Sequence, residues 1–132
     1  MHAVSCRRLI SAALCGLALA AGPGQAGEMM AAEDLLAVIP GATLTGISNE
    51  DFQTRWAQTY DSGGPSGSST GTFGERAYTS QWSVRRNLWC EDWGSGSGCW
   101  RLERVDAVTI QPYHGDRKLP NAWRIMQPAA AE

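Results

Sequence analysis

The sequence predicts a mainly β protein, a small antiparallel barrel or sandwich of about seven or eight strands with one short N-terminal helix. Three observations lead to this prediction. Short segments of alternating apolar and polar residues recur along the chain, clusters of glycine, proline, asparagine and aspartate separate them, and only one segment has helical periodicity. Many short strands at regular spacing are typical of sandwiches and small barrels.

The segment 88–100 is the most informative stretch of the chain. Cys90 and Cys99 flank a glycine- and serine-rich run, and aromatic residues lie on both sides of it. This pattern predicts a β-hairpin, and directly opposed residues on antiparallel strands lie at a separation that a disulfide can bridge. We therefore expect a Cys90–Cys99 disulfide. Two metal thiolates are the alternative, but Glu91 and Asp92 are the only further ligands nearby.

Residues 1–26 have the pattern of a secretory signal peptide. A basic start with Arg7 and Arg8 precedes the apolar run 9–21, which is shorter than the roughly 20 residues of a spanning helix. We expect cleavage after Ala26, or alternatively after Ala20 or Ala21. The mature chain 27–132 is then a single β-rich domain, periplasmic or secreted, with two cysteines and no membrane span.

The charge of the mature chain argues against nucleic acid as a partner. Loss of Arg7 and Arg8 with the signal peptide leaves nine basic residues against all thirteen acidic ones. Proteins that bind nucleic acid usually carry a basic patch and a net positive charge.

The elements can be assigned in chain order. Apolar residues lie close to one helical face over 31–39, with acidic residues near the start, and Pro40 and Gly41 end this helix. The segment 61–71 is rich in glycine and serine and is expected to be a mobile loop. Polar residues at 114–121 indicate a turn, and 128–132 is expected to be a frayed tail. Alternation or β-branched residues predict strands at 42–47, 52–60, 72–74, 77–86, 100–105, 107–113 and 122–127.

The chain resembles a group of small exported proteobacterial proteins of unknown function. The similarity is carried by the Ile-Pro-Gly-x-Thr-x-x-Gly segment at 39–46, by Trp82, and by the Leu-x-Cys pattern at 88–90 followed by Cys99. This resemblance implies a lipocalin-like or related β fold in the periplasm. It implies no activity, and the long glycine- and serine-rich segment departs from the short turn of that group.

No residue pattern predicts catalysis, a metal site or a cofactor. His114 is the one histidine of the mature chain and is expected to be a solvated turn residue. Neighbouring residues on a strand point to opposite faces, so Glu91 and Asp92 cannot easily share a cleft as a catalytic pair and are expected to be solvated loop charges. We therefore expect a protein that is not an enzyme.

The tryptophans suggest two ways in which the protein could bind a partner. Strand alternation places Trp56, Trp82, Trp100 and Trp123 in the core, whereas Trp93 lies within the predicted hairpin loop. A binding surface at the hairpin tip, for an unknown protein such as a secreted hydrolase or for a glycan, would use Trp89, Glu91, Asp92 and Trp93. A pocket for a small apolar ligand would be lined by Trp56, Tyr60, Trp82 and Trp100.

Overall fold

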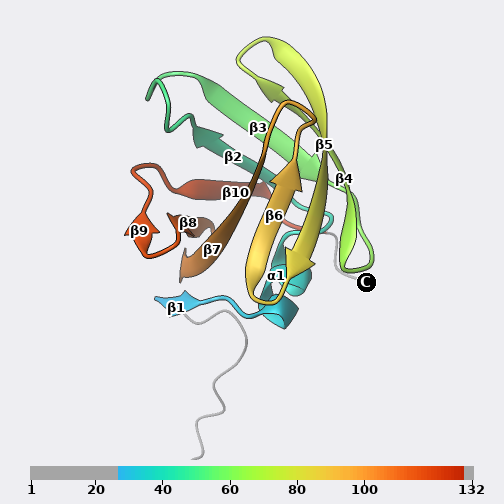
Figure 1. Ribbon diagram of the computed structural model, residues 1–132, viewed down its shortest axis with the longest axis vertical. Coiled ribbons are helices and arrows are strands. Elements are labelled where there is room, and N and C mark those ends of the chain that lie inside the picture. Colours follow the sequence, from blue (N-terminus) through green and yellow to red (C-terminus); the bar gives the residue numbers. More distant parts are fainter. Residues whose placement is uncertain (1–26, 130–132) are drawn as a thin grey trace, which may run out of the picture.

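The computed structural model describes residues 27–129, which form a barrel of antiparallel strands with one short helix (Figure 1). The predicted β class is confirmed, and the choice between barrel and sandwich is resolved in favour of a barrel. The elements are β1 (Glu28–Met29), α1 (Ala32–Val38), β2 (Thr43–Ile47), β3 (Arg55–Tyr60), β4 (Ser66–Phe73), β5 (Arg76–Arg85), β6 (Leu88–Asp92), β7 (Ser97–Asp106), β8 (Thr109–His114), β9 (Arg117–Lys118) and β10 (Trp123–Gln127).

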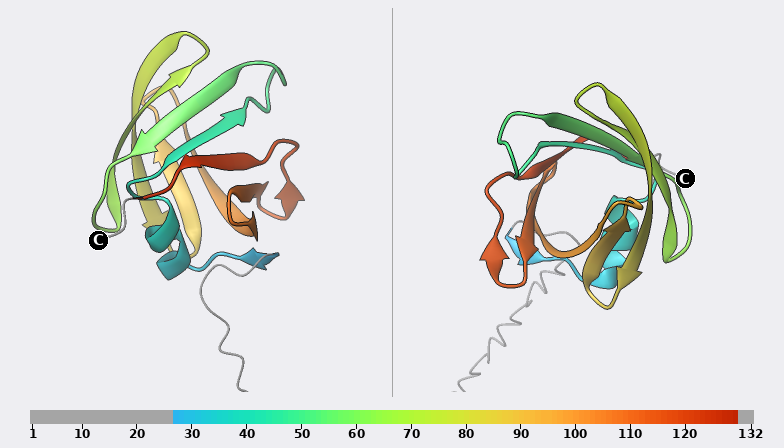
Figure 2. Two further views of the ribbon diagram at one scale, coloured as in Figure 1. Left: turned by 180° about the vertical axis from the view of Figure 1, so that it is seen from behind. Right: turned by 45° about the horizontal axis from the view of Figure 1, so that its top comes forward.

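Eight strands close the barrel. They pair in the order β7-β6-β5-β4-β3-β2-β10-β8, and β8 pairs again with β7, which completes the ring seen in Figure 2. Closure leaves these eight strands without a free edge that could pair with another chain. The two-residue strands β1 and β9 add to β7 and β8 respectively, and neither was predicted from the sequence.

The two ends of the barrel differ. Helix α1 lies across one end, while the β2–β3, β4–β5 and β6–β7 connections gather at the other (Figures 1 and 2). Leu35 and Ile39 of the helical segment are fully buried in the core, and Asp34 Oδ2 accepts the backbone N–H of Ala31 at 2.9 Å at the start of the helix. Within residues 27–129, no helix is long and apolar enough to cross a membrane.

The hydrophobic core fills the half of the barrel next to α1. Trp82 and Trp89 stack there, with ring centroids 4.9 Å apart and an interplanar angle of 15°. Tyr60 meets Trp89 edge to face at 5.3 Å. Burial of several large side chains in one cluster is the main source of stability in so small a domain.

The expectation of a mobile loop over 61–71 is wrong for most of that segment. Residues 66–73 form the eight-residue strand β4, which pairs with β3 on one side and β5 on the other. Apart from Phe73 at its end, its inward positions are Gly67, the buried Ser69 and Gly71. The strand therefore carries little apolar surface of its own, and large side chains from neighbouring strands fill the space in front of it.

Two close approaches explain the glycines of β4. A Cβ atom at Gly67 would lie 2.9 Å from Trp82 Cε2 and closer still to Asp61 Oδ1, and one at Gly71 would lie 3.0 Å from the hydroxyl of Tyr78 and closer still to the backbone oxygen of Ala57. Each glycine is the direct cross-strand partner of the aromatic residue that covers it. Glycine within a strand often marks such a close approach, and here it lets β5 place aromatic rings inside the barrel.

The predicted disulfide hairpin is confirmed. Cys90 and Cys99 are opposed in the β6–β7 ladder, with an S–S distance of 2.07 Å and a Cα–Cα distance of 4.0 Å. The hairpin connection is tighter than expected, because β6 continues to Asp92 and β7 begins at Ser97. The predicted signal peptide 1–26 and residues 130–132 of the predicted tail lie outside the described residues.

Candidate functional site

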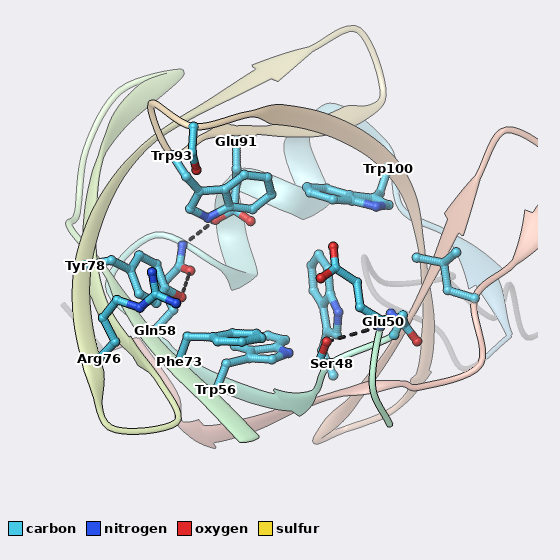
Figure 3. Close-up of a pocket in the computed structure, with 14 residues that line it drawn as sticks. Ser48, Glu50, Trp56, Gln58, Phe73, Arg76, Tyr78, Glu91, Trp93 and Trp100 are labelled. Carbon is cyan, nitrogen blue, oxygen red and sulfur yellow. Dashed lines mark hydrogen bonds between the residues drawn. The ribbon is translucent and has the colours of Figure 1, made fainter. Parts of the chain in front are cut away.

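A cavity of about 510 Å³ occupies the end of the barrel opposite α1 (Figure 3). Its volume lies within the range of small-molecule sites in proteins. The strands supply its walls, and the β2–β3, β6–β7 and β9–β10 connections contribute to its rim. The lining residues are Ser48, Asn49, Glu50, Trp56, Gln58, Phe73, Arg76, Tyr78, Glu91, Trp93, Ser95, Trp100, Leu119 and Trp123.

Four tryptophans form a continuous aromatic wall around this cavity. Trp93 contacts Trp100, Trp100 contacts Trp123, and Trp123 contacts Trp56, each at a centroid distance of 5.7 Å and with steeply inclined rings. These residues come from four different parts of the chain, and Figure 3 shows labelled members of the set around a common space. Edge-to-face pairs of this kind hold one another in place and still offer ring faces to a ligand.

The close packing of this wall again depends on glycine. Gly46 lies opposite Trp56 in the β2–β3 ladder, and a Cβ atom at Gly46 would lie 2.6 Å from Trp56 Cζ2. Gly98 plays the same part for Trp100, at 2.9 Å. Both positions therefore favour glycine for steric reasons.

Glu91 is a buried carboxyl group in the cavity lining. Its residue is 5% exposed, and its side chain accepts a hydrogen bond from Gln58 Nε2. Burial raises the pKa of Glu91 to about 7, although hydrogen bonds from the Tyr60 hydroxyl and the Gln58 amide act in the opposite direction. Among residues 27–129 the only ion pair is Arg101–Asp116, so Glu91 has no cationic partner there.

A buried polar cluster surrounds Glu91. Gln58 Oε1 accepts a hydrogen bond from the Tyr78 hydroxyl at 2.5 Å, and Gln58 Nε2 donates to Ser69 Oγ at 2.7 Å. The hydroxyl groups of Ser69 and Ser80 also hydrogen-bond to each other. Because buried polar networks rigidify a core when satisfied, this cluster fixes the orientation of Glu91.

One polar atom beside this cluster lacks a partner. Trp89 Nε1 is fully buried and has no hydrogen-bond acceptor within the described chain. The indole is nevertheless near enough to Tyr60 and Glu91 to lower the pKa of both groups. A buried donor without an acceptor is uncommon in native proteins, and here it adjoins Glu91, the one buried carboxyl group among residues 27–129.

The hairpin tip holds Trp93 at the mouth of the cavity. The backbone N–H of Trp93 donates to the carbonyl of Gly96 at 2.9 Å, and Asp92 Oδ1 accepts the N–H of Gly94 at 2.8 Å. The Cys90–Cys99 disulfide lies a few residues below this turn. These bonds order the tip, so that Trp93 is half-buried against Trp100 and does not extend into solvent.

The structure separates the residues that the hairpin-tip hypothesis grouped together. Trp89 is fully buried in the core beside α1, and Glu91 is buried inside the barrel, so the expectation of two solvated charges is wrong for Glu91. Asp92 is exposed on the outer face, as strand alternation requires. Of the four residues, Glu91 and Trp93 line the same cavity.

The pocket residues expected from the sequence also divide into two groups. Trp56 and Trp100 line the cavity, whereas Tyr60 and Trp82 lie in the closed core at 1% and 2% exposure. Trp123, which alternation placed in the core, is buried and also forms part of the cavity wall. The other lining residues, among them Gln58, Phe73 and Tyr78, were not predicted as pocket residues from the sequence. Gln58 lies two residues from Trp56 in the same strand, so strand alternation puts both side chains on one face, and this was the available signal.

His114 and the carboxylates do not assemble into a metal centre. His114 is exposed at the end of β8. Within residues 27–129, no three histidine, cysteine, aspartate or glutamate side chains lie together in a way that could hold a metal ion.

Comparisons with known proteins leave the chain without a family assignment. No family model, no curated protein and no solved structure matches it.

Proposed function

We propose that this protein is an exported, non-enzymatic binding protein that holds a small molecule inside its barrel. The observation that carries the proposal is the cavity of about 510 Å³ with an aromatic wall and a few buried polar groups. Ligand sites usually combine a mainly apolar lining with a small number of positioned polar side chains. The Cys90–Cys99 disulfide supports a location in an oxidising compartment, such as the periplasm or the extracellular space.

The cavity is favoured over a binding surface on the outside of the hairpin tip. A protein or glycan partner would need exposed aromatic anchors there. Trp89 is fully buried and Trp93 packs against Trp100 at the cavity mouth, so the tip presents mainly Asp92, glycine and serine to solvent. An inhibitor of a secreted hydrolase is therefore the weaker alternative.

Native mass spectrometry of the protein purified mildly from its own host tests the proposal. We expect a bound mass of a few hundred daltons that is lost on unfolding. Trp100→Ala should reduce its occupancy because it removes one cavity wall, whereas Asp92→Asn, on the outer face of the same hairpin, should retain it. The proposal fails if the protein carries no ligand and a library of small aromatic and amphiphilic compounds leaves its tryptophan fluorescence unchanged.

A further inference from the structure

The lining residues of the inner part of the cavity include a buried acidic group and no basic group. The buried carboxyl group there is that of Glu91. Its polar neighbours Gln58 and Tyr78 are uncharged. Desolvation by burial raises the pKa of Tyr78 to about 12 and that of Tyr60 well above its ordinary value, so both hydroxyl groups remain neutral near pH 7. The charged residues at the rim are Glu50 and Arg76, both of them exposed.

The walls of the cavity suit a cation as well as an apolar body. The faces of tryptophan rings attract cations, most strongly where water is excluded. Trp56, Trp93 and Trp100 surround the space into which Glu91 and Gln58 also project (Figure 3), and Trp123 lines the same space. A positive group inside the barrel would therefore meet ring faces and a carboxylate at once.

A metal ion does not fit this arrangement. Hard cations require several oxygen ligands, and the part of the chain that the structure describes offers no cluster of three metal-binding side chains. An organic ammonium group needs fewer charged partners, because it donates directional hydrogen bonds and its apolar substituents pack against the indoles.

We infer that the ligand is an organic cation, a protonated amine attached to a flat apolar body, with its ammonium group against Glu91 and its body between the tryptophans. This inference rests on the proposed function and specifies the ligand class of the same cavity. Folding has already desolvated Glu91, so binding removes only the water around the amine. The uncharged Gln58 amide orients the carboxylate without neutralising it.

Binding should be coupled to proton release. A protonated Glu91 carboxyl has no net charge to offer an ammonium group, whereas the carboxylate does. Burial raises the pKa of Glu91 to about 7, so an amine that binds near neutral pH must displace a proton from part of the population. Its affinity should therefore fall by about tenfold per pH unit below pH 7. The rim groups Glu50 and Arg76 are exposed, and charges in solvent are screened by water and salt.

Three probes with the same aromatic body test the inference: 2-(1-naphthyl)ethylamine, 2-(1-naphthyl)ethanol and 1-naphthylacetate. Their dissociation constants are measured by isothermal titration calorimetry between pH 5.5 and 8.5, in buffers of different ionisation enthalpy. At pH 8.5 we expect the amine to bind at least about tenfold more tightly than the alcohol. Near pH 7 only the amine should release protons.

Two variants separate a role of Glu91 from a general effect of charge. Glu91→Gln should weaken amine binding by about tenfold or more and abolish its pH dependence, while alcohol binding stays within about threefold. Asp92→Asn, which removes the adjacent carboxylate from the outer face of the same strand, should leave the preference for the amine intact. The pH profile of the wild-type protein tests the same point should Glu91→Gln fail to fold.

The possible outcomes distinguish this inference from the proposed function. Equal binding of amine and alcohol, or tightest binding of naphthylacetate, would overturn the cationic ligand and leave a small-molecule site in place. Failure of all three probes to bind at millimolar concentration, with the protein folded, would count against both.

Discussion

Glu91 and Asp92 are adjacent in β6, yet the first is buried inside the barrel and the second is exposed on its outer face. This pair offers a matched experiment on the effect of a buried carboxyl group. The same chemical change, from carboxylate to amide, can be made on either side of one strand.

Glu91→Gln should remove a pH dependence of stability that Asp92→Asn leaves unchanged. Burial raises the pKa of Glu91 from 4.5 to about 7 in the folded state. Between these values the folded protein binds a proton that the unfolded chain does not bind, so stability falls as pH rises through this interval. Relative to a pH below 4.5, the free energy of unfolding of the wild type should be lower by about 3 kcal/mol at pH 8, because each unit of pKa shift corresponds to about 1.36 kcal/mol. Urea unfolding at pH 5, 6, 7 and 8 measures it. A flat wild-type profile would contradict the assigned environment of Glu91.

Gln58→Leu should shift the same profile to higher pH. The Gln58 amide donates to the Glu91 carboxylate and lowers its pKa, so its loss should raise that pKa further. The Tyr78 hydroxyl would also lose its acceptor, at a cost of about 1–3 kcal/mol of stability. NMR titration of the glutamate side-chain carboxyl carbon would report the shift. Gln81→Leu, at an exposed position of β5, is the control and should leave the titration in place.

Gly67→Ala should destabilise the protein by about 1–3 kcal/mol, because the new methyl group would lie against the ring of Trp82. Gly96→Ala is the matched control. A Cβ atom there meets no other atom within 4 Å, so the change should stay within about 0.5 kcal/mol. Thermal or urea unfolding of both variants gives the comparison. Equal effects of the two substitutions would show that β4 does not pack as described.

Replacing both Cys90 and Cys99 by alanine should lower the free energy of unfolding by about 2–3 kcal/mol, as expected for closure of a short loop. The wild-type protein kept in reductant should show a loss of similar size. Thiol titration of unreduced, denatured protein that comprises residues 27–132 should detect no free sulfhydryl group. Two free thiols in that assay would refute the disulfide.

Individual strands and the disulfide hairpin were predictable where a pattern within a single segment determined them. Alternation over 77–86 located β5, and the spacing of Cys90 and Cys99 located the hairpin. Strand β4 was predicted only at its end, within 72–74, and the rest was missed because its glycines and serines have low strand propensity by themselves. Their role depends on Trp82 and Tyr78 of the next strand, and a single-segment pattern contains no such information.

The candidate site was less predictable for two physical reasons. The glycines after Asp92 suggested that the strand ended at Cys90, whereas two more paired residues turn Glu91 inward, onto the same face as Trp89. Whether an inward aromatic residue lies in the closed core or at the open end depends on how the strands are shifted along one another and on which end of the barrel α1 covers. These are properties of the whole barrel, and they place Trp56 at the open end and Tyr60 in the closed core.

The position of α1 has a kinetic consequence. With one end of the barrel filled by the helix and the stacked core, a molecule in the cavity can leave only through the opening by which it entered. Under the proposed function, the hairpin that carries Trp93 borders this opening, and the disulfide at its base restricts how far that hairpin can move away from it. Reduction of this single bond should therefore shorten the residence time of a bound molecule even where the barrel itself remains folded.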